Sequence, residues 1–371
     1  MKTKKYILST CGISLLSNRF DNNSGHRDLI FTHANAKERV DVPEKDRMVL
    51  EHIIQQKKNL LNGADIPTSA GMSAEINGIM RIFEDTPSQH GDFHQLLSTD
   101  TWLGATTAEM VQTWLMNHFD GISVDILRHQ DLQTADMLSF QLSLSDLIRK
   151  LSKQIPDYAD SGYRVIFNLT GGFKSIQGFL QSIANFYADE TVYIFETSNQ
   201  LMRIPRLPVR MDAVAAVEEN ITVLRNMAVG ITHGDLSTVP EIFLFQMDGE
   251  VMFSPWGELI WDQARKEIYP GRLFPSPRPD KIHYSVKFKK DVGELSQDRI
   301  ELVNLRIDQF NRYLDDESKN PSSLDFKRFK GKSMLPSTHE MDAWADLDAR
   351  RIFGHFEGGR FVLDRLSKGV H

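Results

Sequence analysis

Short apolar runs alternate with longer amphipathic segments along the first 205 residues. Runs of strand length occur at residues 6–10, 93–97, 122–127, 164–169 and 192–196. Between them, apolar side chains recur at helical spacing in segments that begin near residues 43, 73, 107, 142 and 175. Strands that alternate with helices of this length predict an α/β fold, in which an open and mostly parallel sheet carries helices on both faces.

Three of the predicted strands end in loops rich in small residues and hydroxyl groups. These loops are Ser9–Ser14, Ser98–Thr101 and Thr170–Ser175. Ligands of open α/β sheets lie beyond the carboxyl ends of the strands, so the three loops together predict one ligand site.

The loop after residue 169 has the composition of a phosphate-binding turn. Gly171 and Gly172 allow a sharp turn and the close approach of a ligand to the backbone, and amide groups at a helix start attract anions. Lys174 adds a cation, while Thr170 and Ser175 add hydroxyl donors. The sequence predicts an anion site here, although a plain tight turn explains the two glycines equally well.

Two proline-containing segments divide the rest of the chain. Pro205 and Pro208 predict a boundary after the first domain, and residues 270–279, with four prolines, predict a linker. Between them we expect a helix over 212–227, a hairpin that turns at 247–249 and a helix over 256–268. This small α+β unit shows no basic recognition face, so we interpret it as a spacer. The predicted domains are residues 1–208, 209–279 and 280–371.

The C-terminal domain is predicted to be α+β with an antiparallel sheet. An alternating strand at 283–288 precedes helical patterns that end near residue 315, and a hairpin over 350–366 turns at Gly358–Gly359. Alternation along this hairpin places Arg351 and His355 on one face. The apolar side chains of the hairpin share the other face, namely Ile352, Phe356, Phe361 and Leu363.

Composition is that of an ordinary soluble globular protein, with 371 residues, 41% hydrophobic and 25% charged. No apolar run approaches the roughly 18 residues of a membrane span, and the apolar segment after Met1 is too short for a signal peptide. We therefore expect a cytoplasmic protein with no membrane partner. The single cysteine, Cys11, excludes an internal disulfide and a cysteine-based metal cluster, and we interpret it as a small residue in a turn.

Charge is distributed unevenly along the chain. The net charge is −7, but residues 281–371 contain 17 Lys and Arg against 15 Asp and Glu, which leaves the first 280 residues at −9. A nucleic-acid footprint is therefore expected in the C-terminal part. The N-terminal part has to bind anions through backbone amides and a few placed donors.

The N-terminal 205 residues resemble a CARF domain, the Rossmann-like sensor of cyclic oligoadenylates in type III CRISPR ancillary proteins. The motifs that carry the resemblance are residues 9–16, Ala74–Glu75–Ile76, residues 98–101 and, above all, Asn168–Ser175. The resemblance implies a homodimer with a shared pocket for a cyclic RNA, most often the tetra-adenylate. It assigns to that pocket Thr10, Gly12, Ser14, Thr170, Gly171, Gly172, Phe173 and Lys174.

The last ninety residues resemble a RelE-type ribonuclease, the fold of ribosome-dependent mRNA interferases. The resemblance depends on residues 283–295, on the basic turn 326–332 and on the hairpin that begins with Arg350–Arg351. It implies that Arg351 is the catalytic strand arginine, that His371 corresponds to a terminal histidine, and that Lys330 belongs to the cationic cluster. The paired lysines of some members are missing, which leaves the general base open among His339, Glu340 and His355.

Together the two resemblances imply a CARF–RelE fusion, in which cyclic oligoadenylate allosterically activates endoribonuclease cleavage of mRNA, with the ribosome as a partner. Internal attack by a 2′-hydroxyl group needs a base, an acid and cations, but no metal or cofactor. Arginine suits the phosphate because of its forked donors. Histidine suits proton transfer near neutral pH.

Two alternatives stay open at this point. Arg350 and His355 have the R-x4-H spacing of HEPN ribonucleases, which act on free RNA and also occur fused to CARF domains, but that motif belongs to helices and a β hairpin is predicted here. The second alternative is a CARF-type regulator without enzymatic activity that binds DNA, and the missing basic helix argues against it.

Overall fold

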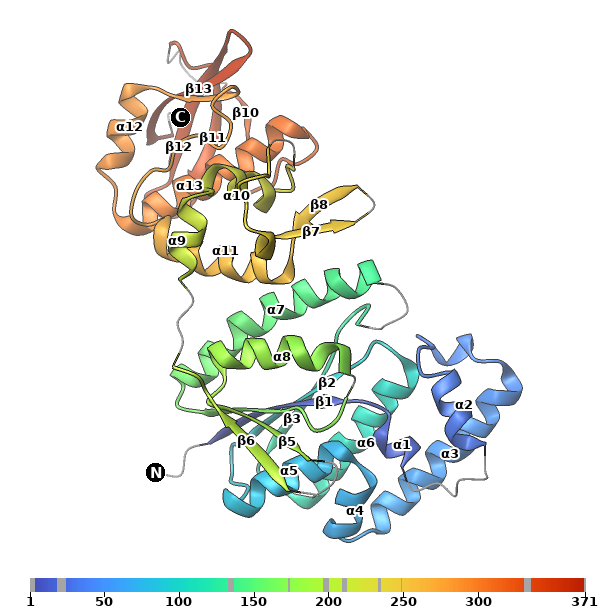
Figure 1. Ribbon diagram of the computed structural model, residues 1–371. Coiled ribbons are helices and arrows are strands. Elements are labelled where there is room, and N and C mark those ends of the chain that lie inside the picture. The colour runs from blue at the N-terminus through green and yellow to red at the C-terminus, as the bar shows by residue number, and fades with distance from the viewer. Residues whose placement is uncertain are drawn as a thin grey trace. The chain divides into compact units, whose positions relative to one another are not determined.

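The computed structural model describes residues 4–18, 25–132, 137–172, 174–195, 200–208, 212–232, 235–247, 249–329 and 335–369 (Figure 1). The chain divides into two compact units, Met1–Arg210 and Met211–His371. Three residues named above lie outside the described residues: Phe173, Lys330 and His371. Within the described ranges, no helix is both long enough and apolar enough to cross a membrane.

A six-stranded sheet forms the centre of the N-terminal unit. Its strands are β1 (Lys5–Cys11), β2 (Phe93–Ser98), β3 (Ser123–Arg128), β4 (Arg164–Asn168), β5 (Glu190–Ile194) and β6 (Leu201–Pro205). They lie in the order β3-β2-β1-β4-β5-β6, and every neighbouring pair is parallel except β5 and β6. The predicted mostly parallel sheet is therefore confirmed.

Strand β6 is absent from the sequence-based prediction, which placed a boundary at Pro205. The proline is the last residue of the strand and lies opposite Glu190 of β5. Because β6 is at the edge of the sheet, the missing amide hydrogen of Pro205 interrupts no ladder between two strands.

Helices cover both faces of this sheet, as predicted (Figure 1). Helices α7 and α8 lie on one face, and α5 and α6 lie on the other. The helices of the unit are α1 (Ser14–Ser17), α2 (His26–Thr32), α3 (Glu44–Gly63), α4 (Ile66–Met72), α5 (Ala74–Asp85), α6 (Trp102–His118), α7 (Met137–Asp160) and α8 (Lys174–Tyr187). Burial from both sides explains the apolar run Tyr6–Ile7–Leu8 in β1, whose side chains are fully buried.

Polar caps set the starts of two of these helices. The Ser73 hydroxyl oxygen accepts from the amide of Ile76 at the start of α5, near the predicted start of this helix. Thr101 caps α6 in the same way, accepting from the amide of Gly104. This cap explains why α6 begins at Trp102, five residues before the predicted start.

The C-terminal unit begins with two short helices, a hairpin and a third helix. These elements are α9 (Ala213–Glu218), α10 (Ile221–Ala228), β7 (Leu244–Met247), β8 (Glu250–Phe253) and α11 (Pro255–Ile268). The predicted helix over 212–227 is thus interrupted between Glu218 and Ile221, whereas the predicted hairpin is confirmed. Residues 270–279, predicted as a linker, are packed into the unit: Phe274 is buried and its amide donates to Asn304.

A five-stranded sheet forms the rest of this unit, with two helices. The elements are β9 (Ile282–Tyr284), α12 (Val286–Gly293), α13 (Gln297–Asp315), β10 (Lys327–Arg328), β11 (His339–Trp344), β12 (Arg350–Glu357) and β13 (Arg360–Lys368). The order is β10-β11-β12-β13-β9, and all pairs are antiparallel except β13 and β9. The expected antiparallel hairpin over 350–366 is confirmed.

The predicted strand over 283–288 is wrong beyond Tyr284. Ser285 ends the strand and caps α12, because its hydroxyl oxygen accepts from the amide of Phe288 at 3.0 Å. The same hydroxyl donates to the carbonyl of Asp364 at 2.6 Å, which fixes the turn against β13.

A buried ion pair joins the two segments of the C-terminal unit. Arg225 of α10 donates through Nε to Asp308 of α13 at 2.8 Å, and the Tyr269 hydroxyl donates to the same carboxylate at 2.5 Å. Arg225 and Asp308 are both more than nine-tenths buried. Residues 212–279 and α13 are therefore held together by charge as well as by apolar packing.

Candidate functional site

The carboxyl ends of β1 and β4 meet where the order of the N-terminal sheet reverses. Strands β1 to β3 extend the sheet in one direction, and β4 to β6 extend it in the other. In open α/β sheets this is the place where ligands bind. Two of the three predicted loops, Ser9–Ser14 and Thr170–Ser175, begin at this point.

The loops after β1 and β4 touch each other through glycine. The Thr10 hydroxyl donates to the carbonyl of Gly171 at 2.5 Å. Gly172 has a φ of +88°, and a Cβ atom on it would lie 2.6 Å from Cβ of Thr10. A Cβ atom on Gly12 would lie 3.0 Å from Cα of Gly172. Close loop packing and the left-handed backbone therefore require glycine here, independently of any ligand.

A buried carboxylate holds the β1 loop to the start of α5. Glu75 is fully buried and accepts from the amide of Gly12 at 2.9 Å and from the hydroxyls of Ser14 and Ser73 at 2.6 and 2.7 Å. Three donors compensate the buried charge. Burial and the nearby Glu75 raise the pKa of the Cys11 thiol well above its ordinary value, so this cysteine is protonated and unreactive.

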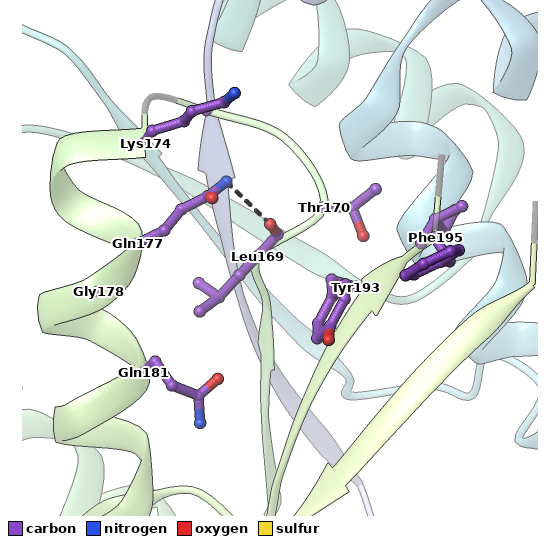
Figure 2. A pocket seen from close by; sticks show the side chains of 10 residues that line it. Leu169, Thr170, Lys174, Gln177, Gly178, Gln181, Tyr193 and Phe195 are labelled. Atoms are coloured by element: carbon purple, nitrogen blue, oxygen red, sulfur yellow. Dashed lines mark hydrogen bonds between the residues drawn. The ribbon is translucent and has the colours of Figure 1, made fainter. Parts of the chain in front are cut away.

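A cavity of about 640 Å³ opens between α8 and β5, beside the β4 loop (Figure 2). Gln177 and Gln181 project from α8 into the space that faces Tyr193 and Phe195. The Gln177 amide donates to the carbonyls of Leu169 and Gly171, both at 3.0 Å, and so fixes the turn. The residues that line the cavity are Leu169, Thr170, Gly172, Lys174, Gln177, Gly178, Gln181, Tyr193, Ile194 and Phe195.

The cavity combines the groups that a nucleotide needs. Lys174 supplies a cation at the first residue of α8, where backbone amides also favour an anion. The hydroxyl oxygen of Thr170 is buried and has no hydrogen-bond partner among the residues that the structure describes. The rings of Tyr193 and Phe195 offer stacking surfaces for a base. Sequence reasoning missed these rings and the two glutamines, although the i, i+4 spacing of Gln177 and Gln181 was visible.

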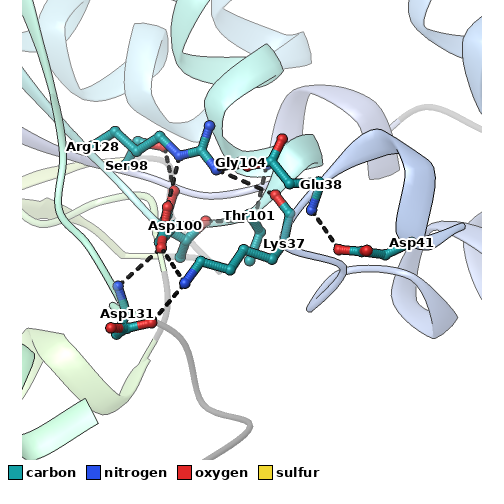
Figure 3. A network of polar contacts seen from close by, with 10 residues as sticks. Lys37, Glu38, Asp41, Ser98, Asp100, Thr101, Gly104, Arg128 and Asp131 are labelled. Atoms are coloured by element: carbon teal, nitrogen blue, oxygen red, sulfur yellow. Dashed lines mark hydrogen bonds and ion pairs between the residues drawn. The ribbon is translucent and has the colours of Figure 1, made fainter. Parts of the chain in front are cut away.

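The third predicted loop, Ser98–Thr101, is occupied by an internal network (Figure 3). Asp100 accepts from Arg128 Nε at 2.8 Å and from the Asp131 amide at 2.9 Å, and it lies 3.3 Å from Lys37 Nζ. Burial opposes the charge, but these donors hold the pKa of Asp100 below its ordinary value. The loop therefore joins β2, β3 and the segment before α3, and its carboxylate is not available to a ligand.

In the C-terminal unit, Arg351 projects from β12 toward two carboxylates of β11. It forms ion pairs with Glu340 and, at 3.3 Å, with Asp342. A cavity of about 300 Å³ adjoins them, lined also by Trp344 and Lys368. Burial, opposed by Arg351, raises the pKa of Asp342 above its ordinary value. The cavity is thus lined by two cations, Arg351 and Lys368, and by the carboxylates of Asp342 and Asp348.

His355 lies on the same face of β12 as Arg351, as alternation predicts. Its Nδ1 is 2.9 Å from Oδ2 of Asp364 on β13. Phe353, fully buried, lies between the two on that face, and the Phe329 ring contacts it edge-on at 5.6 Å. Arg351 and His355 therefore share a face but do not touch.

His339 lies on the opposite face of the same sheet. Its ring stacks on Phe326 at 5.3 Å and meets Phe356 edge-on, and its Nδ1 is 2.8 Å from the Thr338 hydroxyl. Burial and Arg328 lower the pKa of His339. The structure therefore separates His339 from Arg351 and His355, whereas it brings Glu340 against Arg351.

The R-x4-H spacing of Arg350 and His355 lies within strand β12, as predicted, and not in a helix. Within the described residues, no three or more His, Cys, Asp and Glu side chains are arranged to hold a metal ion.

Comparison with known proteins relates one part of the chain to a family. No curated protein matches the chain. Residues 70–207, which include the loop after β4, helix α8 and strand β5, match the model of a family described as a CRISPR-associated protein (Cas_APE2256). The segment that builds the larger cavity is thus similar to a CRISPR-associated protein family.

Proposed function

We propose that the chain is a type III CRISPR ancillary ribonuclease, activated when its N-terminal CARF-type unit binds a cyclic oligoadenylate. The observation that carries this proposal is the cavity beside the β4 loop. It lies within the segment similar to a CRISPR-associated family, and it combines Lys174, two aromatic rings and the Thr170 hydroxyl, which has no partner among the described residues.

Each part of the cavity has a role in binding the nucleotide. A phosphate lies at the start of α8 against Lys174, and an adenine base stacks on Tyr193 or Phe195. The amide group of Gln181, which lines the cavity, bonds the edge of the base in this proposal. A ring-shaped ligand of repeated units is matched by two copies of one loop, so the binding species is a homodimer.

The C-terminal unit, in this proposal, is a RelE-like mRNA interferase whose reacting groups lie on the Arg351 face. Arg351 binds the scissile phosphate through the guanidinium donors that its carboxylate partners leave free. His355 takes part in the proton transfer that RNA cleavage requires. Binding of the ring nucleotide at the N-terminal unit changes the access of RNA to this face, which is a coupling between two sites.

Binding is tested with the full chain, by calorimetry against cyclic tri-, tetra- and hexa-adenylate and a linear oligoadenylate. Lys174→Ala is expected to weaken binding about 10- to 100-fold, because a charge-assisted hydrogen bond is lost. Lys153→Ala, which changes an exposed lysine of α7, is the matched control and should leave affinity unchanged. Equal binding of all four oligoadenylates, or none, would overturn the sensor assignment.

Cleavage is tested separately, with mRNA on translating ribosomes and with free RNA, each with and without the cyclic activator. We expect cleavage on ribosomes that depends on the activator. Equal rates with and without activator would overturn the regulation. Salt-sensitive binding of duplex DNA without RNA cleavage would instead favour a non-enzymatic regulator.

A further inference from the structure

An irregularity in the C-terminal hairpin places a carboxylate behind His355. Phe353 pairs with Arg365 and Gly354 with Leu363, so Asp364 has no partner across the ladder. Such a bulge redirects the side chain of the extra residue. The Asp364 carboxylate contacts the His355 ring, with Nδ1 at 2.9 and 3.1 Å from its two oxygens.

Asp364 is itself fixed from two sides. Its side chain is nine-tenths buried and accepts from the Ser337 hydroxyl at 2.7 Å. Its main-chain carbonyl accepts from the Ser285 hydroxyl at 2.6 Å. A carboxylate held in this way keeps one orientation, and it can hold a neighbouring imidazole in one tautomer.

The other ring nitrogen of His355, Nε2, lies on the side of Glu357, and the His355 side chain is 17% exposed. Glu357, which is largely exposed, is 4.0 Å from Nε2, and the pair residue on β13 is the uncharged Val362. Arg365, the next charged residue of β13, donates to the carbonyl of Leu335 at 3.4 Å. On the β11 side, the amide of Thr338 donates a hydrogen bond to the carbonyl of Gly354. Among the described groups, Asp364 is therefore the one that contacts Nδ1.

We propose that Asp364 is a positioning residue that keeps the proton of His355 on Nδ1, so that Nε2 acts as the general base for RNA cleavage. This inference rests on the proposed ribonuclease function. It selects His355 from the three groups that the sequence left open, since His339 faces the aromatic core and Glu340 is paired with Arg351.

The reaction that this arrangement serves balances without a metal. The 2′-oxygen forms a bond to phosphorus while its proton moves to Nε2 of His355. The bond from phosphorus to the 5′-oxygen breaks, and that oxygen takes a proton from water. The products are a 2′,3′-cyclic phosphate and a 5′-hydroxyl, and His355 then returns its proton to solvent.

The tautomer is measured directly by nitrogen NMR of the full chain, labelled at histidine. In the parent protein we expect the His355 signals of an Nδ1-protonated ring. Asp364→Asn is expected to move the proton to Nε2, while the signals of the exposed His283 on β9 stay unchanged. An unchanged tautomer in a folded Asp364→Asn protein would overturn the positioning role. If that variant fails to fold, Ser337→Ala, which frees one side of Asp364, is measured instead and should broaden the distribution of tautomers.

Activity gives the second measurement. Asp364→Asn and His355→Gln should each lower cleavage about 100-fold or more, the usual contribution of a general base. The double variant should be no slower than His355→Gln alone, because the two residues act as a unit. Free imidazole should partly restore His355→Ala but not Arg351→Ala.

The two failures are distinguishable. If the parent protein cleaves RNA and His355→Gln cleaves it equally fast, the inference is wrong and the proposed function stands. If the parent protein cleaves no RNA with any activator, the proposed function fails, whatever the tautomer of His355.

Discussion

The two candidate sites use their polar residues in opposite ways. At the N-terminal strand ends, the β1-loop residues Thr10, Gly12 and Ser14 bond to other parts of the protein, and the groups left for a ligand come from the β4 loop, α8 and the end of β5. On the C-terminal sheet, Arg351 and His355 project from one strand, and each is paired with a carboxylate. The difference teaches that a loop motif can build a site without lining it, whereas a strand presents its own side chains.

The comparison is tested most strongly by Arg351→Ala. In the proposed mechanism Arg351 stabilises the phosphorane, so its loss should lower RNA cleavage about 100- to 1,000-fold, measured at saturating activator. Binding of the cyclic nucleotide should be unchanged, since the residue belongs to the other unit. Arg360→Ala, at the exposed turn of the same hairpin, is the control. Equal loss in both variants would point to general weakening of RNA binding.

Acid should weaken the N-terminal unit through a buried histidine. His94 is fully buried, and neither ring nitrogen has a hydrogen-bond partner among the described residues. Burial, opposed by nearby Asp92, lowers the pKa of His94 to about 4. The unfolded chain binds the proton near pH 6.5, so stability is full above that value and falls as the pH drops toward 4, by about 3 kcal/mol in all.

Denaturant unfolding at pH 7 and pH 5 measures this effect. His94→Leu removes the titrating group and should flatten the part of the pH dependence that belongs to the first unit. His283→Leu, on an exposed position of the second unit, should leave the profile of the parent protein. If the unfolding free energy of the parent protein and of His94→Leu changes with pH to the same extent, groups other than His94 cause the loss of stability in acid.

Gly172→Ala tests whether the glycine of the β4 loop is required for the packing of that loop. The added Cβ would approach Thr10 and would occupy a backbone with φ of +88°, so we expect a loss of about 2 kcal/mol in unfolding free energy. Gly63→Ala, where no atom lies within 4 Å of the added Cβ, should cost little. If Gly172→Ala abolishes nucleotide binding at unchanged stability, the glycine faces the ligand and the comparison between the two sites weakens.

Glu340→Gln gives the smallest expected effect. Removing one carboxylate frees Arg351 for an anion, and we expect affinity for a short non-cleavable RNA to rise about 3- to 10-fold. Fluorescence anisotropy measures the affinity, and Glu301→Gln on α13 is the control. A fall in affinity would show that Glu340 orients Arg351 instead of competing for it.

The spacing of apolar residues predicted most helices and strands, because the side chains that each element buries recur at a fixed interval along a short segment. The misses occur where one residue has a role that only a distant partner reveals. Ser285 ended a strand because Asp364 lies beside it, and Pro205 was compatible with a strand because that strand is at the sheet edge.

The distinction between local pattern and distant partner also explains which site residues the sequence predicted and which it did not. Alternation placed Arg351 and His355 on one face, because both lie on one strand. It gave no sign of Asp364, whose position depends on a bulge between two strands. Tyr193 and Phe195 were missed because their role depends on α8 lying opposite them.

The parallel pairing of β9 with β13 also has a consequence for synthesis of the chain. Residues Ile282–Tyr284 pair with Phe361–Leu363, about 80 positions later. The sheet that presents Arg351 is therefore incomplete until β13 has left the exit tunnel, since a long-range parallel pair forms only when both strands are available.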